Sequence, residues 1–365
     1  MSTVVTFGEI MARFEAAPYK RFSQVMPGSL EVTFAGAEAN VAAGLVALGE
    51  DARFVTVLPD NPLGHACEAE LRAVGIDCSA VLTSADGRLG LYFIEHGANQ
   101  RSSHVLYDRI GSSVAVCDPA RYRWDEIFGD AAWFHITGIT PAISRQAATA
   151  SLESVKAAKD AGVPVSVDLN FRSKLWRWSP ERDPKQLAGE TMAEIVAFAD
   201  VLVANEADTS DVFGIEGGST DVERGKLDTE GYRSVASQLT RRFPSLSKIA
   251  ITLRESVSAS YNRWGAMVYD AAGDQFVFAP RDESGAYAPH EIRNIVDRVG
   301  AGDSFAAALI HAVRDPELSE SLESIADFAV AASALCHSIH GDFNRVSKEE
   351  ILALMGGIGS GRVRR

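Results

Sequence analysis

Short apolar runs rich in valine and isoleucine alternate along the chain with stretches in which apolar residues recur at helical spacing. Five of these runs are typical of strands buried on both faces: residues 54–58, 132–136, 163–168, 200–204 and 248–252. Helical patterns lie between them, and those over residues 40–48 and 144–161 are each followed by a glycine. This order predicts an α/β fold with a doubly wound, mainly parallel sheet that carries helices on both faces. Ligands of such sheets bind at the carboxyl ends of the strands.

Two segments depart from this alternation. Residues 12–33 contain no amphipathic helix. Residues 87–107 instead alternate between two sets of side chains, with Leu89, Leu91 and Phe93 set against Gly90, Tyr92 and Ile94. A period of two indicates strands, so the two segments predict a small β-sheet in addition to the main one.

Composition and charge narrow the range of partners. The chain has 365 residues and is 46% hydrophobic, enough to bury one large core. Its net charge of −14 argues against nucleic acid or an anionic membrane as the main partner, and any anionic ligand must be held by local positive groups. The sequence has no run of 18 apolar residues and starts without the basic segment of a signal peptide, so we expect a cytoplasmic protein. The four cysteines lack C-x-x-C spacing, which favours buried thiols over a zinc site or disulfides.

The strongest chemical signal lies near the C-terminal end, where Gly300 and Gly302 bracket Ala301 and Asp303 follows. A glycine loop at the start of a helix offers free N–H groups and the positive end of the helix dipole to an anion. A carboxylate beside a bound phosphate is costly unless it takes a proton from an attacking hydroxyl. We therefore predict phosphoryl transfer to an alcohol, with Asp303 as general base and Gly300, Ala301 and Gly302 amides on the phosphoryl oxygens. By itself, the same run also fits a plain helix cap.

Residues 297–305 resemble the second signature of the PfkB, or ribokinase-like, carbohydrate kinases, which runs Asp-Thr-x-Gly-Ala-Gly-Asp-x-Phe; only Arg298, in the threonine position, departs from it. Residues 34–43 resemble the first signature, Gly-Gly-Ala-x-x-Asn-x-Ala, with Ala35 in place of the first glycine. The resemblance implies a ribokinase-like fold, ATP as phosphoryl donor, and contact of Gly36 and Asn40 with a sugar. Without it, a capping role would be the favoured explanation of Asn40.

The resemblance also implies a division of the chain. Residues 12–33 and 87–107 would form a β lid over the active site. Residues 1–11, 34–86 and 108–365 would form the core that binds nucleotide and sugar. The lid strands are expected to pair with those of a second subunit, because free sheet edges and the apolar Leu89, Leu91 and Phe93 need covering. We expect a homodimer or a higher homo-oligomer.

A polar trio follows one of the predicted strands. Strand alternation would place Asp168, Asn170 and Arg172 on one side, at the carboxyl end of the sheet. Arg172 would offer a planar fork to a carboxylate, although a structural Arg–Asp pair is the alternative. The run through Leu175 and Trp176 resembles the 2-keto-3-deoxygluconate kinases of this family, as do residues 136–144 and 340–344. The implied reaction is phosphorylation of 2-keto-3-deoxy-D-gluconate at its 6-hydroxyl by ATP, with fructose or another neutral sugar as the alternative substrate.

In such kinases, lid side chains also touch the keto acid, and their matches here are Tyr92, Tyr107 and Arg109. Many members read Tyr-Tyr-Arg where this chain has Asp108 between Tyr107 and Arg109. Asp108 could therefore neutralise Arg109 instead.

On the nucleotide side, residues 205–208 resemble the Asn-x-x-Glu motif associated with magnesium and phosphate, with Asp208 in the glutamate position. The shorter Asp208 makes an outer-sphere, water-mediated contact to Mg²⁺ more plausible than a direct one, and Asn205 is also explained as a helix cap. The family further implies potassium beside the glycine loop, near Asp297.

Two other classes of protein share parts of this pattern. A Rossmann dehydrogenase needs an early G-x-G-x-x-G, whereas Gly300 and Gly302 lie late and Phe305 stands in the third glycine position; a Walker A motif is also absent. A non-catalytic sugar sensor of the same fold could keep Gly36 and Arg172 but could dispense with Asp303. The presence of Asp303 favours an enzyme. Residues 356–365, glycine-rich and basic, are expected to be a frayed tail.

Overall fold

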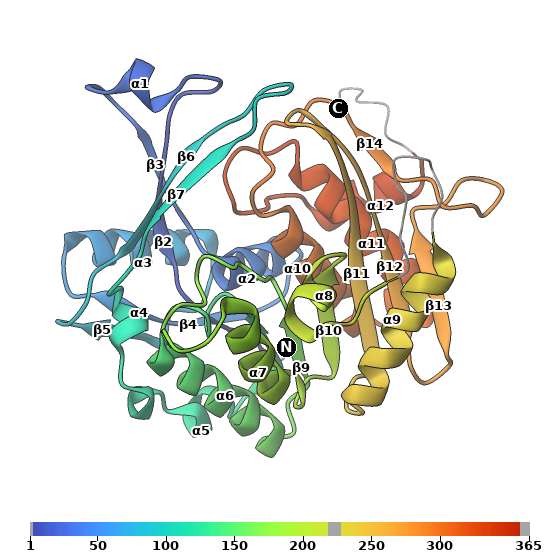
Figure 1. The fold of residues 1–365 in the computed structure, drawn as a ribbon, viewed down its shortest axis with the longest axis horizontal. Helices are drawn as coiled ribbons and strands as arrows, with labels where there is room; N and C mark the ends of the chain where they lie inside the picture. Colours follow the sequence, from blue (N-terminus) through green and yellow to red (C-terminus); the bar gives the residue numbers. More distant parts are fainter. Residues whose placement is uncertain (1–2, 218–227, 358–365) are drawn as a thin grey trace.

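The fold is built around a ten-stranded sheet, seen in a computed structural model that describes residues 3–217 and 228–357 (Figure 1). The strand order is β13-β12-β11-β10-β9-β8-β1-β4-β5, and β14 pairs with β12. The seven neighbouring strands β11, β10, β9, β8, β1, β4 and β5 run parallel, while β12, β13 and β14 pair antiparallel. Their bounds are β1 Thr3–Phe7, β4 Ala52–Pro59, β5 Val81–Ser84, β8 Ala131–Thr137, β9 Val165–Asp168, β10 Val201–Asn205, β11 Lys248–Ser258, β12 Tyr261–Asp270, β13 Gln275–Ala279 and β14 His290–Ile292. The predicted fold class is confirmed.

Burial on both faces explains the continuous apolar runs of the central strands. On β1, Val4 packs into one hydrophobic cluster and its neighbour Val5 into another, on opposite faces of the sheet. The five predicted strands are all found. The one expected at residues 163–168 begins only at Val165, because Pro164 has no N–H to donate to a neighbouring strand.

Helices cover both faces, and two of them carry the residues of the glycine loop and the first signature. Helix α10 (Ala301–Arg314) packs against α2 (Ala37–Ala47) and α11 (Leu322–Cys336). A side-chain carbon on Gly44 would lie 2.9 Å from the Cβ of Ala307, so only small residues allow α2 and α10 to approach this closely. The other helices are α1 Phe22–Val25, α3 Pro62–Val74, α4 Ser113–Val116, η1 Pro119–Arg121, α5 Trp124–Ile127, α6 Arg145–Asp160, α7 Pro184–Val196, α8 Asp208–Phe213, α9 Thr229–Arg242, η3 Leu318–Glu320 and α12 Lys348–Met355.

A separate four-stranded sheet rises from one side of the core, in blue and cyan in Figure 1. Its strands are β2 Met11–Glu15, β3 Glu31–Ala35, β6 Gly90–Glu95 and β7 His104–Asp108, in the order β3-β2-β6-β7. The strands fall largely within the two segments for which the sequence predicted a small sheet. Its two edge strands, β3 and β7, each have one partner among the described residues.

Three further expectations concern the whole chain. Among the described residues, no helix is both long and apolar enough to span a membrane. All four cysteines are buried and none is paired with another. Of the tail at residues 356–365, only Gly356 and Gly357 are described, so the expectation of fraying falls mostly outside the described residues.

Candidate active site

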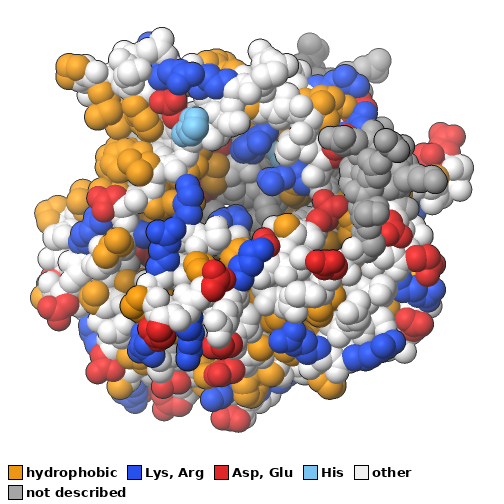
Figure 2. Space-filling model, viewed as in Figure 1, with side chains coloured by type: hydrophobic (Ala, Val, Ile, Leu, Met, Phe, Trp, Pro, Cys, Tyr) orange, Lys and Arg blue, Asp and Glu red, His pale blue; other side chains and the backbone are white. Residues whose placement is uncertain are grey.

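A cavity of about 670 Å³ lies at the carboxyl ends of the parallel strands, beneath the small sheet. Figure 2 shows Lys and Arg side chains gathered around the hollow in this face. Every site residue predicted from the sequence lines this cavity except Asp297. Those that do are Gly36, Asn40, Tyr92, Tyr107, Arg109, Asp168, Asn170, Arg172, Asn205, Asp208, Gly300, Ala301, Gly302 and Asp303.

The glycine loop opens helix α10 toward the cavity. Gly300 has a left-handed backbone with φ 82°, and a Cβ there would lie 2.4 Å from the carbonyl oxygen of Asp342. No other residue type fits this position without displacing the chain. The first helical hydrogen bond runs from Ser304 N to Gly300 O at 2.8 Å, which leaves the N–H groups of Ala301 and Gly302 without a helical partner. The loop therefore has the free donors that an anion site requires.

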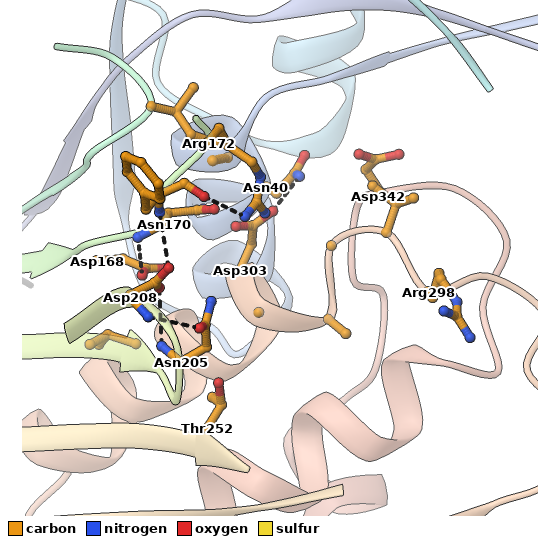
Figure 3. Close-up of a pocket in the computed structure, with 18 of the residues that line it drawn as sticks. Asn40, Asp168, Asn170, Arg172, Asn205, Asp208, Thr252, Arg298, Asp303 and Asp342 are labelled. Carbon is orange, nitrogen blue, oxygen red and sulfur yellow. Dashed lines mark hydrogen bonds between the residues drawn. The ribbon is translucent and has the colours of Figure 1, made fainter. Parts of the chain in front are cut away.

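Asp303 stands in the first turn of that helix and is only 8% exposed. Asn40 donates from Nδ2 to Asp303 Oδ2 at 2.6 Å (Figure 3), so its side chain does more than cap α2. Burial raises the pKa of Asp303 to about 7; the Asn40 hydrogen bond opposes the shift, whereas the carboxylates of Asp342 and Glu38 add to it. A carboxyl group with a pKa near neutrality is suited to accept a proton in catalysis.

Asp168, Asn170 and Arg172 do come together, but not for the predicted reason. Strand β9 ends at Asp168, and Asn170 is left-handed with φ 35°, so strand alternation does not extend through the trio. A turn brings them to the cavity, and Asn170 N donates to Asp168 Oδ1 at 3.1 Å. Burial raises the pKa of Asp168, and the nearby carboxylates of Asp208 and Asp303 add to the shift.

Arg172 is exposed in the cavity and points toward Asp303 in Figure 3. It donates one hydrogen bond, from a terminal nitrogen to the carbonyl oxygen of Phe171 at 3.1 Å. Within residues 3–217 and 228–357 it forms no ion pair, so the alternative of a structural Arg–Asp pair finds no support. Most of its donors are free for a ligand.

The side chains that the small sheet contributes are partly engaged with the protein. Tyr92 donates its hydroxyl to Asp342 Oδ1 at 2.9 Å. Arg109 forms a buried ion pair with Glu9, and Asp108 instead pairs with Arg88. The suggestion that Asp108 neutralises Arg109 is therefore wrong, because each of the two residues pairs with a different partner. Tyr107 keeps an exposed ring 6.0 Å from the ring of Tyr92.

On the other side of the cavity, Asn205 has the geometry of a cap. Its Oδ1 accepts from Ala207 N at 2.9 Å and from Asp208 N at 3.1 Å, at the start of α8. Asp208 is buried, and its two oxygens accept from Phe171 N at 3.2 Å and Asn205 N at 3.1 Å. Burial raises its pKa. These contacts fit the structural interpretation of Asn205, while the position of Asp208 in the cavity wall still suits a water-mediated contact to a metal.

Asp297 lies behind the cavity and binds a buried arginine. Arg13 is fully buried, and one of its terminal nitrogens donates to Asp297 Oδ2 and to Glu15 Oε2, each at 2.5 Å. Its other terminal nitrogen pairs with Asp342. The second oxygen of Asp297 accepts from Val299 N at 3.1 Å. Both oxygens of Asp297 are thus bonded to other groups of the protein, and potassium near this carboxylate stays a prediction.

Sequence reasoning missed several charged residues of the cavity wall, among them Glu9, Arg254 and Asp342. Glu9 follows the buried strand β1, and a charged residue directly after such a strand was the signal that could have found it. Asp342 belonged to the run at residues 340–344, which was noted only as a resemblance. Arg298, noted as a departure from the family signature, also lines the cavity.

Comparison with known proteins identifies the family. The sequence profile of the pfkB family carbohydrate kinases matches residues 1–253 and 258–348. The chain belongs to this family of kinases. A 2-dehydro-3-deoxygalactonokinase from Haloferax volcanii is 33% identical over 354 residues, which cover 97% of this chain and 96% of that protein. The crystal structure of a 2-dehydro-3-deoxygluconokinase from Thermotoga maritima is 41% identical, with a TM-score of 0.86 and 98% coverage of both chains.

The kinase is also similar to enzymes that act on a neutral sugar. Fructokinase-1 from Oryza sativa subsp. japonica is 28% identical over 358 residues, 96% of this chain and 97% of that protein. The prediction of an ATP-dependent sugar kinase, rather than a dehydrogenase or a sugar sensor, is confirmed by the family. The choice between an acidic and a neutral sugar depends on the residues of the cavity.

The pKa of Asp303 predicts how the rate of this kinase depends on pH. A carboxyl group accepts a proton only when it is ionised, so kcat/KM should rise with pH and level off above the pKa of about 7. Below that pH, the rate should fall about tenfold per pH unit. The measurement is kcat/KM from about pH 5.5 to 9, with samples returned to pH 8 to show that the loss is reversible. A flat profile across this range would contradict the assignment.

Proposed function

We propose that this kinase transfers the γ-phosphoryl group of ATP to the 6-hydroxyl of 2-keto-3-deoxy-D-gluconate. The observation that carries the proposal is Arg172, an exposed guanidinium in the cavity without an acidic partner among the described residues. A guanidinium binds a carboxylate with two parallel hydrogen bonds, which a neutral ketose cannot accept in the same way. The relatives named for 2-dehydro-3-deoxy sugar acids support the same class of substrate.

The residues of the cavity contact different parts of the sugar acid. Arg172 holds the carboxylate of the sugar acid, and Gly36, Asn40, Asp168 and Asn170 contact its hydroxyls. Tyr107 offers an exposed phenol from the small sheet. Tyr92 and Arg109 are already bonded to Asp342 and Glu9, so they shape this end of the cavity. Tyr92 can meet the sugar only as an acceptor, whereas Arg109 keeps further donors.

In the chemical step, Asp303 takes the proton of the 6-hydroxyl as its oxygen attacks the γ-phosphorus. The bond from that phosphorus to the ADP oxygen breaks, and the products are the sugar acid 6-phosphate and ADP. The amides of Gly300, Ala301 and Gly302 hold the oxygens of the transferring group. Magnesium, bound by ATP oxygens and water, would neutralise phosphate charge, with Asp208 in its outer sphere beside Asn205.

Replacing the proposed base tests this step. Asp303→Asn keeps the size of the side chain but removes the proton acceptor, so kcat should fall by about 10²–10⁴. ATP affinity should be retained, since the amide removes a charge that repels phosphate. Single-turnover rates and calorimetric titration with ATP measure the two quantities. Turnover close to that of the wild type would exclude Asp303 as the base.

The substrate is tested by truncating Arg172. Arg172→Ala should lower kcat/KM for 2-keto-3-deoxygluconate about ten- to a hundredfold, the value of a lost charge-assisted contact. Fructose gains nothing from the guanidinium, so its kcat/KM should change little. Arg172→Lys should recover only part of the loss, because an ammonium keeps the charge without the fork.

The matched control is Arg177→Ala, an exposed arginine five positions further along that does not line the cavity. It should leave both substrates and the melting temperature unchanged. An equal fall for acid and neutral substrates in Arg172→Ala would point to a neutral sugar. The 4-epimer of the acid, 2-keto-3-deoxygalactonate, presents the same carboxylate and belongs in the same assay.

We further propose that the small sheet pairs with that of a second copy. A row of apolar side chains crosses all four strands, because Phe14 is in register with Val32 and with Phe93, and Phe93 with Leu106. Val32 is 51% exposed and Leu106 65%. An uncovered apolar row beside free sheet edges is typical of an interface. The earlier expectation that Leu89 belongs to this surface is wrong, because Leu89 is buried in the core.

A charge placed on this row should separate the copies. We expect a dimer in sedimentation velocity and a shift of Leu106→Asp toward monomer, with self-association weakened about tenfold or more by burying an unpaired carboxylate. Leu63→Asp, at an equally exposed leucine on α3, is the control and should stay dimeric. A wild-type protein that sediments as a monomer would refute the proposal.

A further inference from the structure

Four arginines line the cavity, and one of them has no partner. Arg109 pairs with Glu9, Arg298 donates to the carbonyl oxygens of Ser258 and Ala259 at 3.1 and 2.8 Å, and Arg172 donates to that of Phe171. Within the described parts of the chain, the side chain of Arg254 takes part in no hydrogen bond or ion pair. All of its N–H groups are therefore left for water or a ligand.

The sheet places Arg254 on the side of the cavity that also holds Asn205 and Asp208. It lies on β11 two residues after Thr252, so the two side chains share one face of the strand. Thr252 is in register with Asn205 of the parallel neighbour β10. On the other side, Arg254 is in register with Trp264 of β12, which lines the cavity as well.

The electrostatics of this wall favour an anion. Arg254 is exposed in the cavity, yet the surrounding protein desolvates its guanidinium and lowers its pKa, and the positive charge of Arg172 lowers that pKa further. Desolvation and the charge of Arg254 likewise lower the pKa of Arg298. Two neighbouring carboxylates, Glu206 and Asp208, act in the opposite direction without forming an ion pair with it. A partly desolvated cation without a counter-ion is unfavourable, and an anion that enters the cavity relieves this cost.

The cavity also needs a cation to receive ATP. Its wall carries five buried carboxylates. Glu9 and Asp342 pair with arginines, whereas Asp168, Asp208 and Asp303 form no ion pair among the described residues and, when ionised, repel a triphosphate. We propose that Arg254 binds the phosphate oxygens of ATP, in addition to the amides of the glycine loop and magnesium. Its planar fork suits two oxygens of one phosphate. Arg172 then remains available for the sugar acid, so that two anionic ligands are held by two separate guanidinium groups.

Nucleotide titrations without sugar test this role. Arg254→Gln should weaken ATP binding in calorimetry about ten- to a hundredfold, the value of a charged hydrogen-bonded contact. Adenosine carries no phosphate, so its affinity should not change. Arg254→Lys should recover part of the ATP affinity. In the wild type, ATP affinity should fall with added salt more steeply than in Arg254→Gln, because one ionic contact is screened.

A neighbouring arginine provides the control. Arg263 lies on β12, pairs with Glu255 and does not line the cavity, so Arg263→Gln should bind ATP like the wild type. Unchanged ATP affinity in Arg254→Gln would overturn the proposal, and so would an equal loss for ATP and adenosine.

A third outcome would also overturn it. If Arg254→Gln loses affinity for the sugar acid while ATP binding is intact, Arg254 belongs to the sugar site. The proposal rests on the sugar-kinase activity but not on the identity of the sugar, because the ATP and adenosine titrations contain none. A wrong assignment of the sugar acid would leave their result unaffected.

Discussion

The buried guanidinium of Arg13 joins three parts of the chain that lie far apart in sequence. It comes from the small sheet and binds Asp297, just before the glycine loop, and Asp342, after helix α11. Three buried carboxylates, those of Glu15, Asp297 and Asp342, share this one guanidinium, so removing Arg13 would leave them without their common counter-charge at a cost of about 3–5 kcal/mol. This contact therefore fixes the small sheet over the core. Through Asp342 it also determines where Tyr92 and the backbone around Gly300 lie.

The cavity beside this cluster is lined by buried carboxylates and by arginines of opposite charge. Asp303 has a pKa near neutrality because it is desolvated and faces other carboxylates, while Asn40 holds it in place. The same carboxylates would repel both a sugar acid and ATP in a chain with a net charge of −14. Arginine is the residue that can offset them locally, because its guanidinium stays charged when partly buried. The arrangement of Arg172 and Arg254 thus bears on substrate choice and on nucleotide binding.

The family shows that the chain is a sugar kinase, whereas the choice of sugar depends on the residues of the cavity. Relatives of similar overall identity include kinases named for sugar acids and for fructose, so overall similarity does not choose between them. Shared elements such as Asn40, Asp303 and the glycine loop serve any sugar hydroxyl and any triphosphate. The choice depends on a charged group that meets the carboxylate, and that is why the place of Arg172 in the cavity carries more weight than the fold.

The sequence by itself determined the buried strands of the main sheet and the anion-binding character of the glycine loop at residues 300–302. Both-face burial makes β4, β8 and β10 continuous apolar runs, and the left-handed turn at Gly300 is favoured by glycine. Those signals are local. The pairing of Arg109 with Glu9, the cluster around Arg13 and the unpartnered Arg254 were decided only by the tertiary structure. The trio from Asp168 to Arg172 was found, yet for the wrong reason, because the end of β9 and the turn at Asn170 are not visible in an alternating pattern. Partners of a buried charge depend on the order of strands in the sheet, which brings together residues hundreds of positions apart and leaves no local pattern to read.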